Sequence, residues 1–93
     1  MDSEHYKTLQ AIAAPVREKG RIDKLVMRDV ILRLCSGRYI TLRTLADLLN
    51  REPDSIRIHY INPMLKEGLL LSRYPGQPNH PQQGYKTKEG SLS

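Results

Sequence analysis

Four polar side chains between residues 53 and 66 recur at the spacing of one helix face. They stand at positions i, i+4, i+7 and i+11 of a helical period: Ser55, His59, Asn62 and Lys66. Hydroxyl, imidazole, amide and ammonium groups gathered on one side of a helix can hydrogen-bond to base edges and phosphates in a nucleic-acid groove. The alternative interpretation is that they form the solvated side of an amphipathic helix.

Basic side chains around this stretch could add contacts to phosphate groups. Arg57 lies beside the polar row, and an exposed Ile58 would suit either a thymine methyl group or a protein partner. We expect these residues, near the preceding turn and in the C-terminal hairpin, to contact the phosphate backbone: Arg43, Arg51, Arg73, His80 and Lys86. Each of them could instead be an ordinary solvated charge.

The sequence gives little support for catalysis or metal binding. His5, His59 and His80 are far apart, and Cys35 is the only cysteine, so no disulfide can form within the chain. No HExxH spacing and no glycine-rich loop followed by Lys-Ser/Thr is present. We therefore expect no enzymatic activity, no cofactor and no metal.

Residues 41–68 must position the polar row, and they predict two helices joined by a tight turn. The first helix has an apolar face at i, i+3, i+4, i+7 spacing: Leu42, Leu45, Ala46 and Leu49. Thr41 can cap its start, and Asn50 can end it in the left-handed conformation. This arrangement is typical of a helix-turn-helix, whose second helix can lie in a DNA major groove.

The second helix is expected to begin at Pro53, with Asp54 in its first turn, and to end at Gly68. Its core face should consist of Pro53, Ile56, Tyr60 and Met64. Pro63 cannot donate to the carbonyl of His59. We therefore expect a kink or a division there, with Asn62 capping the second part.

The residues before Thr41 predict supporting elements. Residues 1–22 are expected to form a short helix or a linker, because Pro15 interrupts the helical spacing. A helix is expected from Asp23, its N-cap, to Cys35. Its buried face should consist of Val26, Met27, Val30, Ile31 and Leu34. Residues 38–40 could form a small strand.

The C-terminal part predicts a hairpin with a long tip. Residues 69–74 (LLLSRY) and 84–87 (GYKT) should pair, and the proline-rich PGQPNHPQQ between them should form a stiff loop. Residues 88–93 are expected to be disordered. The order of elements predicts a mainly α fold with a small β-hairpin (α+β), a winged helix-turn-helix domain over residues 23–87 with the hairpin as its wing.

Composition is compatible with binding to a polyanion. The chain has 93 residues, enough for one small domain, and its 15 Lys and Arg against 10 Asp and Glu give a net charge of +5. No apolar run approaches the roughly 18 residues that a membrane span requires. The polar N-terminus and the single cysteine favour a cytoplasmic location without membrane insertion.

Three runs of residues between positions 14 and 87 carry a family resemblance: APVREKGRI, LRLCSGRYITLRTLADLLNREPDSIRIHYINPMLKEGLL and RYPGQPNHPQQGYKT. They resemble the C-terminal winged-helix region of bacterial transcriptional regulators related to ATP-dependent DNA helicases, which carry a Schlafen-like divergent ATP-binding domain upstream. The resemblance implies that this chain is the DNA-binding module of a longer protein. It places the recognition helix at residues 53–66 and the wing at residues 69–87.

Together these patterns predict a domain that binds double-stranded DNA, with an upstream ATP-binding domain as a further partner. The alternative is a protein-interaction or oligomerisation module, a homodimer included, because winged helices also pack against other chains. Ile58, the apolar hairpin and the stiff proline-rich tip motivate that alternative.

Overall fold

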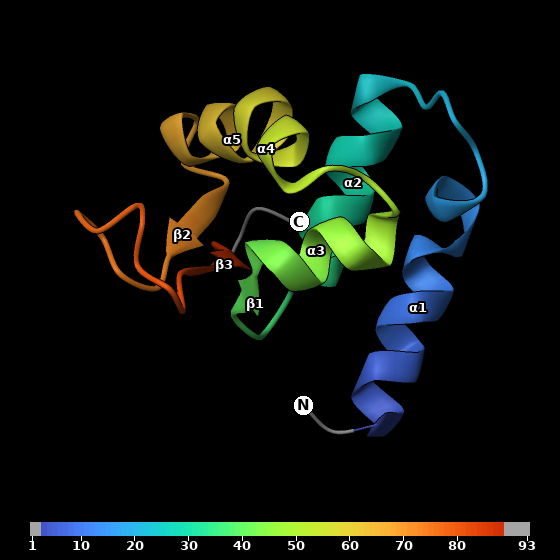
Figure 1. Ribbon diagram of the computed structural model, residues 1–93, viewed down its shortest axis with the longest axis horizontal. Coiled ribbons are helices and arrows are strands. Elements are labelled where there is room, and N and C mark those ends of the chain that lie inside the picture. Colours follow the sequence, from blue (N-terminus) through green and yellow to red (C-terminus); the bar gives the residue numbers. More distant parts are fainter. Residues whose placement is uncertain (1–2, 89–93) are drawn as a thin grey trace.

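The computed structural model describes residues 3–88, in which helices surround one core and a small sheet lies at one end (Figure 1). The elements follow in the order α1 (Ser3–Arg17), α2 (Lys24–Leu34), β1 (Ile40–Thr41), α3 (Leu42–Leu49), α4 (Pro53–Ile56), a π-helical turn (Arg57–Ile61), α5 (Asn62–Lys66), β2 (Leu70–Ser72) and β3 (Gly84–Thr87). Within this range three antiparallel strands form one sheet in the order β1-β3-β2. The expected mixture of helices with a small antiparallel sheet is confirmed.

The N-terminal residues form a helix that belongs to the core. Leu9, Ala13 and Val16 of α1 are buried in the same cluster as α2 and α3. The helix continues through Pro15 to Arg17, which is further than the sequence indicated. Pro15 is exposed, so water can satisfy the carbonyl that its missing N–H leaves without a helical partner.

Local capping chemistry sets the helix ends as expected. The Asp23 carboxylate accepts a hydrogen bond from the Leu25 N–H at 2.8 Å, and the Thr41 hydroxyl accepts one from the Thr44 N–H at 3.2 Å. Asn50 ends α3 in the left-handed region, with φ 54° and ψ 50°.

The buried face of α2 is narrower than the sequence predicted. Met27, Val30, Ile31 and Leu34 are buried, but Val26 is 49% exposed, so its assignment to the core was wrong. The reason is tertiary, because α2 packs mainly against α1 and β3, and Val26 lies at the edge of its apolar stripe.

The second helix of the pair is continuous from residue 53 to 66 but contains a π turn. The Asn62 N–H donates to the Arg57 carbonyl, which is a bond of the i→i+5 type. Pro63 follows directly, and the wider turn accommodates a residue that can neither donate to nor closely approach the His59 carbonyl. The division expected at Pro63 therefore takes the form of one extra residue in the turn before it.

The π turn changes which side chains of this helix are buried. Ile56 and Ile61, five positions apart, are both fully covered, whereas Tyr60 is only half-buried. Pro53 is exposed at the first helical position, so its expected core role was wrong. Asn62 is not a cap, because it has helical dihedral angles, φ −59° and ψ −49°, and α5 has no side-chain cap.

The hairpin completes the sheet and closes the core. Leu70 pairs with Thr87 and Ser72 with Tyr85, while Ile40 of β1 pairs with the other edge of β3. The N–H of Lys88 donates to the Leu69 carbonyl at 3.0 Å, so the expected disordered tail does not include this residue. Residues 89–93 of that expected tail lie outside the described range.

Replacement of Gly84 by alanine should destabilise the fold. An added Cβ would stand 3.1 Å from the Ile40 carbonyl oxygen and 3.3 Å from its carbon, and these backbone atoms can move only if the β1–β3 pairing is disturbed. We expect a loss of about 1–3 kcal/mol in the free energy of unfolding, measured by urea denaturation. Gly20→Ala is the matched control, because its Cβ would meet no atom within 4 Å. Equal midpoints for the two variants would contradict this account of the sheet.

Candidate nucleic-acid interface

The four polar residues of the predicted recognition surface are all exposed: Ser55, His59, Asn62 and Lys66. Their neighbour Ile58 is 54% exposed, as expected. They do not form one straight row, however, because the extra residue in the π turn rotates everything after it by about 100°. Ser55 and His59 line a cleft beside α2, and neither Asn62 nor Lys66 does.

The carboxylates at the two ends of this helix are each close to an arginine. Glu67 lies 3.0 Å from the Arg28 guanidinium, and this ion pair joins the end of α5 to α2. Asp54 lies 3.6 Å from the Arg57 guanidinium at i,i+3 spacing. The exposed middle of the helix, residues 55–66, contains no carboxylate.

A cleft of about 400 Å³ separates the start of α3 and the π turn from the tip of the β2–β3 loop. Arg43 and Arg57 line the side formed by the helices, and residues 78–81 line the opposite side. Tyr85 forms part of the floor. Burial raises the pKa of Tyr85, and the Arg57 guanidinium acts in the opposite direction.

A second cleft, of about 270 Å³, lies on the α2 side of the helix pair. Arg21 and Lys24 line it together with Ser55 and His59. Sequence reasoning missed these two cations. They precede Ser55 by more than thirty positions with no regular spacing to it, and only the packing of the α1–α2 connection and the start of α2 brings them there.

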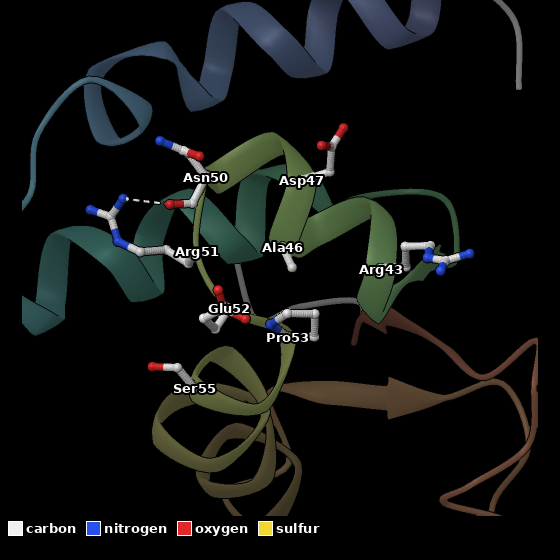
Figure 2. A pocket seen from close by; sticks show the side chains of 8 residues that line it. All are labelled: Arg43, Ala46, Asp47, Asn50, Arg51, Glu52, Pro53 and Ser55. Carbon is white, nitrogen blue, oxygen red and sulfur yellow. Dashed lines mark hydrogen bonds between the residues drawn. The ribbon is translucent and has the colours of Figure 1, made fainter.

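Arg51 is engaged within the fold rather than free for a ligand. Its guanidinium donates to the carbonyl oxygens of Leu49, Asn50, Val16 and Lys19, at 3.0, 3.2, 3.4 and 2.6 Å respectively. These bonds join the end of α1 to the turn between α3 and α4. Figure 2 shows Arg51 and Arg43 at opposite ends of the groove that runs over this turn.

His80 and Gln83 build the tip of the hairpin. The His80 ring stacks on Tyr74 at 3.8 Å between centroids, and its Nδ1 accepts a hydrogen bond from the Gln82 N–H at 3.0 Å. The buried Gln83 amide accepts from the Tyr74 and Gly84 N–H groups and donates to the Tyr74 and Gln77 carbonyls. The tip is therefore held by side-chain bonds, and sequence reasoning missed Gln83 because nothing local marks it.

The two remaining predicted contacts, Arg73 and Lys86, lie on the hairpin beside aromatic rings. The Arg73 guanidinium stands 5.5 Å from the Tyr74 ring centre, and the Lys86 ammonium stands 5.8 Å from that of Tyr39. Neither side chain lines the two clefts that flank the helix pair. The structure thus places them on the hairpin but outside the surface around Ser55 and His59.

The described residues do not bring metal-ligating groups together. Among residues 3–88, no cluster of three or more His, Cys, Asp or Glu side chains has the proximity that a metal ion needs. The Nε2 atom of His5 is buried and has no hydrogen-bond partner. Cys35 is fully buried at the end of α2, where burial raises the pKa of its thiol to about 12.

The Cys35 thiol should therefore be unreactive in the folded protein. Because the thiolate is the nucleophile, a group with a pKa of about 12 remains in the thiol form near neutral pH. We expect the chromogenic disulfide DTNB to react at least about 100-fold more slowly with native than with denatured protein at about pH 8. Similar rates in the two states would contradict the burial of this residue.

Comparisons with known proteins give no family for this chain. No protein-family model, curated protein or solved structure matches it. Across the described residues, no helix combines the length and apolar character needed to cross a bilayer. The geometry of the exposed helix and its two flanking clefts therefore carries the functional argument.

Proposed function

We propose that this chain is a winged helix-turn-helix module that binds double-stranded DNA and has no enzymatic activity of its own. In this proposal, residues 53–66 form the recognition helix, α3 is the helix before it, and the β2–β3 hairpin is the wing. The order of elements from α2 to β3, with β3 between β1 and β2, supports the assignment.

The observation that carries the proposal is an exposed polar helix surface with a basic cleft on each side. Arg43 and Arg57 line the cleft beside the wing, and Arg21 and Lys24 line the one beside α2. A major groove is about 12 Å wide and has a phosphate backbone along each rim. A helix in that groove would bring both pairs of cations towards phosphates.

The π turn divides the roles of the helix residues in this proposal. Ser55 and His59 lie at the N-terminal end, which enters the groove deepest in helix-turn-helix complexes, so they are the proposed contacts to base edges. Asn62 and Lys66 lie beyond the turn and contact the backbone or outer bases. Arg73 and Lys86 supply charge near the wing. Arg51 and His80 maintain the turn and the tip.

The net charge of +5 and the family resemblance support the same function. The proposal includes the context that the resemblance implies: a cytoplasmic bacterial transcriptional regulator related to DNA helicases, with an ATP-binding domain upstream. In that context the present chain supplies DNA binding, and any nucleotide-dependent activity belongs to the upstream domain.

The double substitution Arg57→Ala and Lys66→Ala should weaken DNA binding and flatten its salt dependence. Each phosphate contact contributes about 0.9 to the slope of log K against log salt, so the slope should fall by about 1–2. Fluorescence anisotropy with random-sequence duplex, at low and near-physiological salt, measures both quantities. The wild-type chain is expected to bind with a Kd of about 1–100 μM at near-physiological salt.

The matched control removes two cations elsewhere, by Lys7→Ala on α1 and Arg33→Ala near the C-terminal end of α2, where Arg33 pairs with Asp29 at 3.0 Å. Both side chains are exposed, so this variant loses the same net charge without touching the proposed interface. Equal losses in the two double variants would show that only net charge matters. Absence of salt-sensitive binding by the wild-type chain would reject the proposed function.

A second candidate, a protein-interaction or oligomerisation module, is favoured by apolar side chains next to the same surface. Leu25 is 73% exposed at the rim of a cleft of about 310 Å³ that also contains Tyr60 and Pro63. Sedimentation at increasing concentration tests this reading. A dimer that covers Ile58 and Ser55 would make DNA binding and self-association mutually exclusive. Added duplex DNA would then shift the dimer towards monomer, which sedimentation can measure.

A further inference from the structure

We infer that the cleft between the start of α3 and the tip of the β2–β3 loop clamps one phosphodiester of the DNA backbone, so that DNA docks on the wing side of the helix pair and not over its turn. The inference rests on the proposed function, because it names the phosphate contact and the side from which the duplex approaches.

Two arginines from different elements line this cleft. Arg43 belongs to the first turn of α3 and Arg57 begins the π turn, fourteen positions later. Within the described residues, Arg43 has no hydrogen bond or ion pair. Arg57 has Asp54 at 3.6 Å, but the Asp54 side chain is 85% exposed, and such a solvated pair leaves the guanidinium available. Guanidinium groups bind phosphate oxygens through paired N–H donors, and two arginines that line one cleft can supply two such pairs.

The opposite wall is rigid before any ligand arrives. The stacked His80 and the Gln83 amide, with its four hydrogen bonds, fix the tip, and Pro78 and Pro81 restrict its backbone. Two side-chain amides line the cleft, Asn79 and Gln83. The N–H donors of Gln83 bond to loop carbonyls, and those of Asn79 do not. The volume of about 400 Å³ is within the range of ligand-sized sites. A site of fixed shape loses little conformational entropy when a phosphodiester enters it.

The groove over the turn is larger, about 560 Å³, but its charge is unfavourable for DNA. Asp47 and Glu52 line it, and the carboxylate of Asp47 accepts a hydrogen bond from the Tyr6 hydroxyl at 3.2 Å. Its second arginine, Arg51, is held by backbone carbonyls, so Arg43 is the one cation of this groove that lacks a partner. In Figure 2, Arg43 stands at the opposite end of the groove from Arg51. Phosphates over the turn would therefore face carboxylates, and phosphates on the wing side would face arginines.

A double-mutant cycle on the two arginines tests the clamp. Binding of random-sequence duplex is measured for wild type, Arg43→Gln, Arg57→Gln and the double variant, since glutamine keeps part of each aliphatic stem. Each variant's loss is the factor by which its DNA affinity falls below that of wild type. If both guanidinium groups hold one phosphate, the product of the two single-variant factors should exceed the double-variant factor by at least about threefold. Glu52→Gln should change the affinity less than about twofold. Thermal unfolding of each variant checks that the fold is retained, and Arg43→Lys with Arg57→Lys replaces the pair if it is not.

The outcomes separate the clamp from the function on which it rests. Failure of the wild-type chain to bind duplex at low salt rejects the proposed function and the clamp together. Two results would reject the clamp alone. One is that the affinity factors lost in the two single arginine variants simply multiply in the double variant. The other is that Glu52→Gln strengthens binding by as large a factor as an arginine substitution weakens it. Inorganic phosphate is the second probe, followed by NMR of the arginine side chains. Saturation by inorganic phosphate at low millimolar concentration would make the cleft a free-phosphate site and reject a backbone clamp.

Discussion

One extra residue in the turn before Pro63 determines the surface of the second helix. A regular helix through residues 57–61 would turn Ile61 away from Ile56, but the i→i+5 bond brings both into the core. The same turn leaves Ile58 and His59 exposed and places Arg57 at the edge of the cleft beside the β2–β3 loop. Single π turns within α-helices are frequent at functional sites, where they redirect side chains without ending the helix. Here the turn places Asn62 and Lys66 on a different side of the helix from Ser55 and His59.

Charge is distributed unevenly around this helix pair, although the whole chain carries only a net +5. Arginine and lysine side chains line the cleft beside the β2–β3 loop (Arg43, Arg57) and the cleft beside α2 (Arg21, Lys24, Arg51), and no carboxylate lines either of them. In the groove over the turn, Asp47 and Glu52 accompany the arginines. Electrostatic steering depends on such local patterns more than on net charge. If the chain binds DNA as proposed, this arrangement favours approach of the duplex from the side of the β2–β3 loop.

Several polar side chains that resemble ligand contacts in the sequence are engaged in holding the surface together. Arg51 joins the end of α1 to the turn through backbone carbonyls, and His80 with Gln83 organises the hairpin tip. A charged or polar residue near a proposed interface can therefore serve either to contact the ligand or to fix the backbone. The two roles differ in hydrogen-bond partners, which only the folded chain reveals.

The sequence by itself determined the start of α2 and both ends of α3, because these depend on neighbouring residues, and it indicated that the two hairpin strands pair. The Thr41 cap and the left-handed Asn50 are local choices of hydrogen bond and backbone angle, and they can be read from residue type. Only the tertiary structure decided that α1 joins the core, that Val26 is exposed, and which cations face each cleft. Those outcomes depend on contacts between segments tens of residues apart, which periodicity along the chain does not encode.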